Sequence, residues 1–225
     1  MATTFLAALL LSAAPQAVAG PPTEALRSAF ARVNSVLAGP AIGAEPATRL
    51  AACRQAFRSV FDVRSAARYS LGRQWQARTP EEQNDFTTLF GDLIESSYVD
   101  WLATAAEVDP KSGVEVQYVA ETVDGETALV RTAISSRRGR DLPVSYDMVY
   151  DDGRWQIRDV YVDDISVLAN YRAQFTRIIR DYSYTGLLAR MKALRSGEAR
   201  PAAVVRAGPE TAAFTIPMPA SFQAP

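Results

Sequence analysis

Two adjacent acids and a serine, Asp163, Asp164 and Ser166, are the residues of this chain whose types most directly suggest chemistry. Carboxylate and hydroxyl oxygens can bind a metal ion or carry protons in catalysis. However, neighbouring side chains of a strand point to opposite faces, so the two acids cannot hold one ion together. A calcium loop would need more oxygen ligands at regular offsets, and none follow. We therefore predict no metal site and interpret these residues as a strand-to-helix joint, where an acidic residue or Ser166 near the first helical turn satisfies free backbone N–H groups.

Tyr146 and Asp159 form a second candidate pair, because a tyrosine and an aspartate alone can transfer protons in ketosteroid-isomerase-like sites. An isomerase-like enzyme on a cone-shaped α+β fold is therefore one hypothesis for this chain. The sequence contains no histidine, which excludes Ser-His-Asp and Cys-His catalysis and removes the commonest zinc ligand. The single cysteine, Cys53, excludes an intrachain disulfide and a cysteine-rich metal cluster.

Charged side chains indicate which partners the chain can have. The 24 Lys and Arg residues are offset by 25 Asp and Glu residues, and this balance without a basic stripe argues against nucleic acid as a partner. Arg68, Arg73, Arg172 and Arg177 can meet a phosphate group or an acidic partner, but ordinary solvated arginines are the default interpretation.

Helical periodicity governs the first half of the chain. Gly39-Pro40 and Gly43 separate two amphipathic segments, and Asp62 begins a further short helix that ends at Gly72. Thr79-Pro80-Glu81-Glu82 predicts the start of a longer helix, because it combines a threonine cap, a proline at the first helical position and a glutamate that completes a capping box. The apolar faces of the first two segments consist of Leu26, Phe30, Val33 and Leu37, followed by Leu50, Cys53, Phe57 and Val60.

From residue 114 the apolar period changes to two. Four strands joined by short, glycine-containing turns predict an antiparallel meander sheet, with a bulge near Asp159 where the apolar phase shifts. After Ser166 the pattern is helical again to about Arg195, with an interruption near residues 183–186. Helices first, a sheet next and a helix last predict an α+β fold with helices packed on one face of the sheet.

The two ends of the chain differ from this domain in composition. Residues 1–19 resemble a secretory signal peptide: an apolar run over residues 5–11 precedes the cleavage pattern Ala17-Val18-Ala19, although the usual positive charge at the start is missing. Residues 197–225 are rich in alanine and proline without a sustained period, which is typical of a disordered tail. We therefore expect an exported protein with a single domain over residues 20–196.

Three segments of the domain carry a family resemblance. The first is ARYSLGRQW at residues 67–75, and the second is TPEEQ at residues 79–83 with the aromatic helix that follows it. The third combines PVSY at 143–146, WQIRDV at 155–160, ISV at 165–167 and NYRAQF at 170–175. Over residues 25–194 the chain resembles the MlaC-like periplasmic phospholipid carriers, also called toluene-tolerance auxiliary proteins of ABC transporters. One departure is Asp164, a position where glycine is commoner in that family.

The resemblance implies a specific fold and role. Helices, a four-stranded or slightly larger antiparallel sheet and a C-terminal helix would enclose an apolar pocket that holds acyl chains. The carrier would be a periplasmic monomer that shuttles phospholipid between an outer-membrane lipoprotein complex and an inner-membrane ABC transporter bearing an MCE protein. Neither covalent chemistry nor a cofactor is implied, and phospholipid is the cargo.

Large apolar side chains on the predicted helices and strands are the candidates for the wall of this pocket. Such patterns also describe an ordinary core, so a non-binding periplasmic adaptor that contacts membrane complexes by its surface stays a third hypothesis. The predicted lipid-binding residues are Phe90, Leu93, Ile94, Tyr98, Val116, Val130, Tyr146, Met148, Val160, Tyr171, Phe175 and Ile178.

Overall fold

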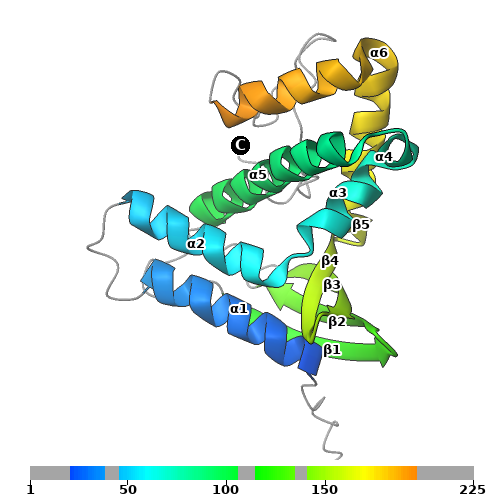
Figure 1. Ribbon diagram of the computed structural model, residues 1–225. Coiled ribbons are helices and arrows are strands. Elements are labelled where there is room, and N and C mark those ends of the chain that lie inside the picture. The colour runs from blue at the N-terminus through cyan, green and yellow to red at the C-terminus, as the bar shows by residue number, and fades with distance from the viewer. Residues whose placement is uncertain (1–20, 39–45, 106–114, 135–140, 197–225) are drawn as a thin grey trace, which may run out of the picture.

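Five helices precede the sheet, and the first two of them lie side by side (Figure 1). The structure, a computed structural model, describes residues 21–38, 46–105, 115–134 and 141–196 of the chain. The helices are α1 (Pro21–Ala38), α2 (Pro46–Val60), α3 (Val63–Leu71), α4 (Arg73–Gln76) and α5 (Pro80–Ala105).

Side-chain caps fix where two of these helices begin. Asp62 caps α3, because one of its carboxylate oxygens accepts a hydrogen bond from the backbone N–H of Ser65 at 3.0 Å. At the start of α5, Thr79 Oγ1 accepts from the N–H of Glu82 at 3.2 Å. The Glu82 carboxylate in turn accepts from the N–H of Thr79 at 2.9 Å. The capping box predicted from the sequence is thereby confirmed.

Five antiparallel strands form the sheet, in the order in which they occur in the chain. This is the predicted meander, extended by a two-residue edge strand. The strands are β1 (Val116–Asp124), β2 (Thr127–Ile134), β3 (Leu142–Asp151), β4 (Arg154–Val162) and β5 (Ile165–Ser166).

The predicted bulge in β4 is confirmed at Arg158. Asp147 pairs with Asp159 while the next residue of β3, Met148, pairs with Ile157, so Arg158 is the extra residue. Because of this extra residue, the side chains of Ile157 and Val160 both face the helices although three positions separate them.

The adjacent acids Asp163 and Asp164 form the turn between β4 and β5. Their φ angles are 52° and 63°, the positive values that a two-residue hairpin turn of this twist requires. A side chain disfavours this backbone conformation, so a glycine at position 164 would adopt it without strain. The acids therefore make a tight corner, and Ser166 alone of the three is the helix cap.

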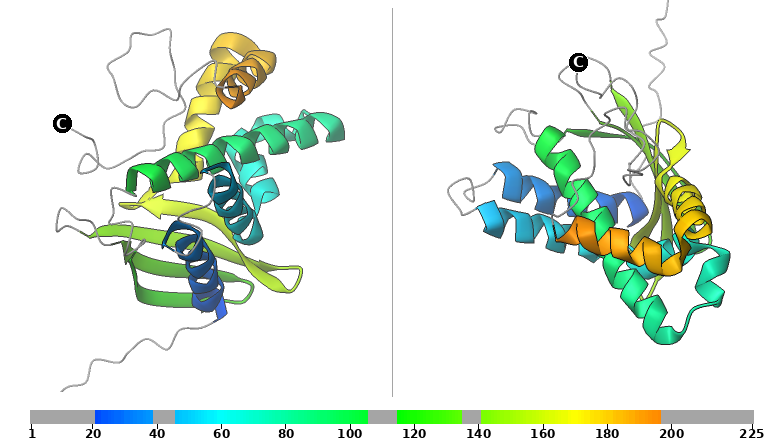
Figure 2. Two further views of the ribbon diagram at one scale, coloured as in Figure 1. Left: turned by 90° about the vertical axis from the view of Figure 1, so that its left-hand side faces the viewer. Right: turned by 90° about the horizontal axis from the view of Figure 1, so that it is seen from above.

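The last helix, α6 (Val167–Arg195), is interrupted at Ser183, whose φ of 79° and ψ of 168° are not helical. Ser166 caps its start by accepting a hydrogen bond from the N–H of Ala169 at 2.9 Å. After the interruption, α6 changes direction and passes over α5 (Figures 1 and 2), and this segment buries Tyr184, Leu187 and Met191. No helix in the described parts of the chain is long and apolar enough to cross a membrane.

The helices cover one face of the sheet (Figure 2). Strands β2 and β3 alternate buried side chains with more exposed ones, as expected for a sheet with one covered face. The observed architecture is therefore the predicted α+β fold, with helices on one side of an antiparallel meander.

An aromatic cluster joins α5 to α6 at the centre of the helical layer. Phe90 packs edge to face against Tyr171 and Phe175, with ring centroids 5.5 and 5.7 Å apart. Phe86 stacks on Phe90 at 5.9 Å and meets Phe175 edge to face at 5.7 Å. All four side chains are buried, so this cluster fixes the angle between the two longest helices.

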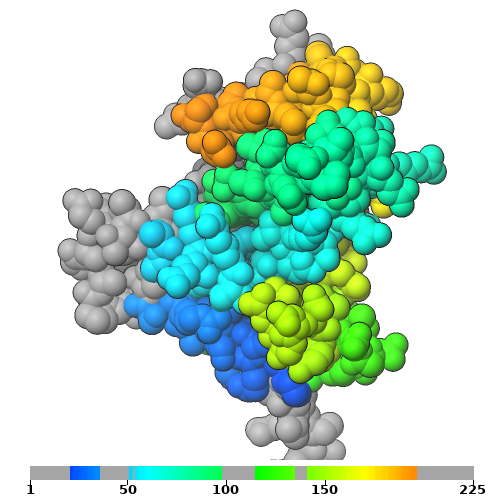
Figure 3. Space-filling model, viewed as in Figure 1, coloured from blue at the N-terminus to red at the C-terminus, as the bar shows by residue number. Residues whose placement is uncertain are grey.

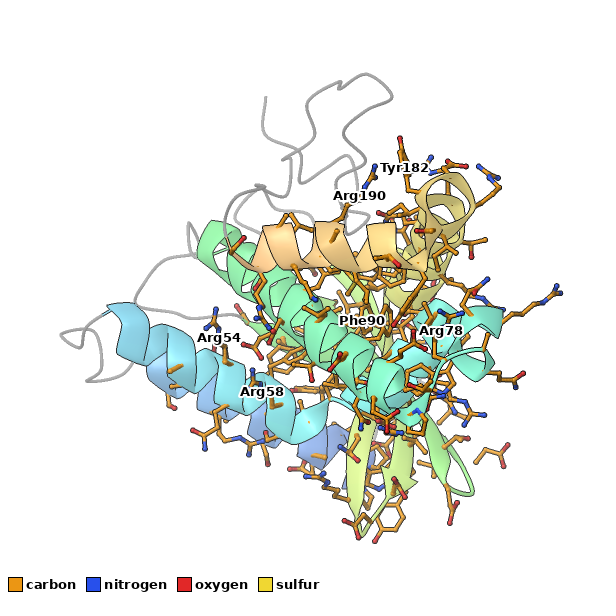
Figure 4. All side chains as sticks on the ribbon, turned by 45° about the horizontal axis from the view of Figure 1, so that its top comes forward. Arg54, Arg58, Arg78, Phe90, Tyr182 and Arg190 are labelled. Atoms are coloured by element: carbon orange, nitrogen blue, oxygen red, sulfur yellow. The ribbon has the colours of Figure 1, made fainter. Side chains whose placement is uncertain are left out.

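Replacing Phe90 by alanine is expected to lower the free energy of unfolding by about 3–5 kcal/mol, because the ring is fully buried and its loss leaves a cavity among three aromatic partners. Urea unfolding followed by circular dichroism measures this change. Tyr182→Ala is the matched control: that ring is 50% exposed and contacts only the guanidinium of Arg190 among its described ring contacts (Figure 4), so a loss of no more than about 1 kcal/mol is expected. Equal losses in the two variants would contradict the central role of Phe90.

Candidate functional site

An apolar cavity of about 150 Å³ lies between the helices and the covered face of the sheet. Helices α1 and α2 form one side of it, β2 to β4 form the opposite side, and α5 and the start of α6 close it. The lining residues are Leu26, Ala29, Phe30, Val33, Ala56, Phe57, Val60, Phe61, Ile94, Ile134, Leu142, Val144, Tyr146, Ile157, Asp159, Val160, Val162, Val167, Leu168 and Tyr171.

The helical side of the cavity follows directly from the apolar spacing in α1 and α2. Leu26, Phe30 and Val33 recur every three or four residues, so they project from one side of α1. Phe57 and Val60 do the same on α2, and the ring of Phe57 stacks on that of Phe61 at 4.7 Å. Figure 3 shows that α1 and α2 form a continuous outer surface beside the β3–β4 hairpin, so these two helices separate the cavity from solvent on that side.

The sheet side is organised in rows across the strands. Tyr146 pairs with Val130 on one neighbouring strand and with Val160 on the other, so the three side chains share the covered face. The Tyr146 ring extends from the covered face of the sheet and packs edge to face against the ring of Phe30 on α1, with centroids 6.0 Å apart. This contact joins the helical wall to the sheet wall.

Among the described residues that line the cavity, Asp159 is the only carboxylate, and its oxygens accept hydrogen bonds. One oxygen accepts from the backbone N–H groups of Val160 and Leu168, at 2.7 and 3.2 Å, and the other accepts from the hydroxyl of Ser166 at 2.5 Å. Burial raises the pKa of this carboxyl above its ordinary value, against the lowering effect of these three hydrogen bonds. The side chain therefore ties β4 to the first turn of α6.

Tyr171 of α6 lines the cavity, and its ring also belongs to the aromatic cluster around Phe90. Its ring is completely buried, and burial raises the pKa of its phenol to about 12, although a hydrogen bond with Ser97 acts in the opposite direction. The phenol is therefore neutral at physiological pH, and this part of the wall carries no charge.

Four of the twelve predicted wall residues line the cavity: Ile94, Tyr146, Val160 and Tyr171. The structure places the others around it. Phe90 and Phe175 form the layer beneath Tyr171, Val130 and Met148 lie on the covered sheet face beside Tyr146, and Val116 is half-buried on β1. Leu93 and Ile178 are buried on α5 and α6, and the side chain of Tyr98 lies outside the described residues. Their contact with a ligand stays a prediction.

The sequence interpretation did not assign the contribution of α1 and α2 to the wall. The signal was present, because the same apolar spacing that predicted these helices also marks their cavity-facing sides. Periodicity shows that a helix face is buried, but it does not show whether that face meets a packed core or a free volume.

The polar candidates from the sequence have other roles in the structure. Asp159 shares the cavity with Tyr146, but it caps α6 through its hydrogen bonds. Arg172 lies over the ring of Tyr69, with its guanidinium 5.4 Å from the ring centroid. Within the described ranges, no group of three or more His, Cys, Asp or Glu side chains could hold a metal ion.

The arrangement is suited to holding an apolar ligand. Its walls are almost entirely carbon, so water gains few hydrogen bonds inside, and the transfer of an apolar group from water into this space is favourable. Methylene chains fit this chemistry better than any ligand that needs polar contacts deep in a pocket.

Comparison with known proteins gives a family and a fold. Residues 27–193 match the family model described as MlaC protein. A search of curated protein sequences gave no significant match. Among solved structures, the phospholipid-binding protein from Ralstonia solanacearum, determined in complex with a phospholipid, superposes with a TM-score of 0.67 at 17% sequence identity. The match covers 79% of this chain and 98% of that one, so the two chains share a fold over nearly the whole of the Ralstonia protein.

Asp159→Asn is expected to change how stability depends on pH. A folded-state pKa above the ordinary 3.8 means that the ionised carboxyl is disfavoured in the fold, so the stability associated with this group is fully present below the unfolded pKa and is lost as the pH rises through the folded pKa. Asparagine cannot ionise, and its amide oxygen can still accept from the two N–H groups. The free energy of unfolding of the variant minus that of the wild type should therefore increase between about pH 4 and pH 7. Urea unfolding across this range measures it, and a constant difference would show that the buried charge has no such effect.

Proposed function

The chain belongs to the MlaC family, and on this premise we propose that it is a periplasmic carrier that holds the acyl chains of a phospholipid in the apolar cavity and performs no covalent chemistry. The observation that carries the proposal is the cavity wall: nineteen of its twenty described residues are hydrophobic, and the exception, Asp159, is engaged in structural hydrogen bonds. The Ralstonia protein of the same fold was determined with a phospholipid, which supports this cargo.

The energetics of lipid transfer explain why such a cavity would be needed. Moving acyl chains from a membrane into water costs about 0.8 kcal/mol per methylene, so two chains with roughly thirty methylenes cost on the order of 20 kcal/mol. Unassisted passage through an aqueous compartment is therefore extremely rare. A protein that offers the chains a dry apolar volume lowers this cost without any catalytic group.

A cavity of this size would have to expand when lipid enters. A volume of about 150 Å³ is below the roughly 300–1,000 Å³ of pockets that hold drug-sized ligands. The walls come from several elements, and the contact between Phe30 and Tyr146 joins two of them across the cavity. The described conformation thus fits a closed form that expands around its cargo.

The polar groups of the cavity favour a carrier over the isomerase-like alternative. A proton-transfer carboxylate must be free to approach its substrate, whereas Asp159 accepts from Val160, Ser166 and Leu168. Breaking these bonds would uncap α6. The hydrophobic wall around the carboxylate supports binding in preference to chemistry.

We further propose a route for the carrier. Residues 1–19 would direct export, and the remaining protein would act as a monomer in the periplasm. It would exchange phospholipid between an outer-membrane lipoprotein complex and an inner-membrane ABC transporter with an MCE-domain protein. Family membership supports this assignment.

Native mass spectrometry of protein purified from the periplasm tests the proposal. A complex whose additional mass matches a phospholipid, released and identified by fragmentation, is the expected result. Protein that carries no lipid and takes none up from liposomes would contradict the carrier function, and would favour an adaptor that acts through its surface.

Ala29→Trp is expected to reduce lipid loading by about tenfold or more, because the indole of this cavity-lining residue would occupy the free volume that the acyl chains enter. Ala31→Trp is the matched control, since Ala31 is exposed on the same helix and should leave loading unchanged. Uptake of a pyrene-labelled phosphatidylcholine from liposomes measures both variants, after circular dichroism has confirmed that each is folded. Normal loading of the Ala29 variant would remove α1 from the lipid-contacting wall.

A further inference from the structure

A cluster of charged side chains joins α2 to α5 beside the cavity. The carboxylate of Glu95 on α5 lies 2.7 Å from Nε of Arg58, which donates a hydrogen bond to it, and 2.9 Å from Nε of Arg54. Both arginines belong to α2 and are seen on the side of that helix that faces α5 (Figure 4). The Glu95 side chain is only 4% exposed, whereas those of Arg54 and Arg58 are 43% and 62% exposed.

A second carboxylate extends this cluster to the end of the last helix. Asp92 lies one turn before Glu95 on α5, and its oxygens are 3.8 Å from Arg58 and 3.4 Å from Arg195 of α6. The five residues Arg54, Arg58, Asp92, Glu95 and Arg195 are called the ionic latch below. The Glu95 pairs form its core because Asp92 is more exposed and its distances are longer.

The ionic latch lies directly outside the wall of the cavity. Arg54 and Arg58 flank Ala56 and Phe57 along α2, and both of these residues line the cavity. On α5, Glu95 follows Ile94, which lines the cavity as well. A separation of α2 from α5 would therefore break the Glu95 pairs and widen the cavity in the same movement.

The start of α1 and the end of α2 are fastened to the sheet through backbone N–H groups. The N–H of Thr23 at the start of α1 donates to a carboxylate oxygen of Glu121 at 2.8 Å. Just after α2, the N–H of Asp62 donates to the carbonyl of Ile157 at 2.9 Å, and Phe61 forms a bridge with the same strand residue. These contacts attach the α1–α2 pair to the sheet at this end, while the ionic latch attaches α2 to α5.

We propose that the ionic latch controls access to the cavity: the α1–α2 pair pivots about its attachment to the sheet, and separation of Glu95 from Arg54 and Arg58 admits or releases the ligand. This inference rests on the proposed function, because it assumes that a ligand enters the cavity. Charged groups suit such a joint. The partly exposed guanidiniums remain solvated when the joint opens, while the buried Glu95 carboxylate strongly favours re-closure.

Glu95→Gln removes the buried charge with little change in shape. We expect the loaded variant to release a pyrene-labelled phosphatidylcholine into phosphatidylcholine vesicles at least about tenfold faster than the wild type, because loss of a buried charge pair acts mainly on the rate of separation. Arg58→Gln is a second variant at a largely exposed position, and it should accelerate release in the same direction without endangering the fold. For the wild type, release should also quicken with added salt, and this dependence should weaken in Glu95→Gln.

Arg32→Gln is the matched control. Arg32 lies on α1 and donates to the hydroxyl of Ser59 on α2 at 3.0 Å, so it ties the two helices to each other and not to α5. Like Arg58→Gln, this variant removes one positive charge from the α1–α2 pair, yet its release rate should stay within about twofold of the wild type. Faster release in this control to the level of Glu95→Gln would overturn the latch, since the effect would follow from general loosening of the pair.

Amide hydrogen exchange of the lipid-free proteins separates failure of the latch from failure of the carrier function. Amides of α2 should exchange at least about tenfold faster in Glu95→Gln and Arg58→Gln than in the wild type, while those of β2 and β3 should not change. Unchanged exchange in α2 of both variants overturns the latch, whatever the lipid result. If α2 exchanges faster in both variants but the wild type takes up no lipid, the ionic latch is supported and the carrier proposal is contradicted.

Discussion

The helices must keep water from the covered face of the sheet, although they leave a cavity between themselves and that face. This constraint accounts for most of the architecture. A single helix cannot cover β2, β3 and β4, so α1, α2, α5 and the start of α6 share the task and meet around the cavity. Close packing would normally eliminate such a space, because each lost contact weakens the fold. The aromatic cluster around Phe90 supplies dense packing next to the cavity. This packing allows the cavity that Tyr171 lines to persist.

Local features of the fold were predictable because the residues that cause them are close in sequence. The capping box at Thr79, the glycine turns of the meander and the phase shift around Arg158 each involve fewer than ten consecutive residues. The cavity depends on packing between segments that are more than a hundred residues apart, such as Phe30 against Tyr146. Periodicity identified both residues as buried, but only the fold shows that their rings meet and that both line a cavity.

The region around Asp159 illustrates the same limit for polar groups. Sequence reasoning paired this aspartate with Tyr146 as a chemical hypothesis, and it assigned the cap of the last helix to one of the adjacent acids or to Ser166. In the structure Asp163 and Asp164 form the corner and Ser166 is the cap, but Asp159 also satisfies the first turn of α6, which was not predicted. The bulge at Arg158 brings Asp159 into this position, and a one-residue change in register cannot be weighed from residue types alone.

The interruption of α6 at Ser183 has a mechanical consequence. A continuous helix of this length would act as a stiff rod, and a displacement at its first turn would reach its last. The non-helical backbone at Ser183 divides α6 into two helical segments that run in different directions (Figure 1). The first segment carries Leu168 and Tyr171 at the cavity, and the second carries Arg195 against Asp92. The change of direction at Ser183 thus lets one helix serve two places: its inner segment packs at the cavity, and its outer segment passes over α5 and brings Arg195 to the ionic latch.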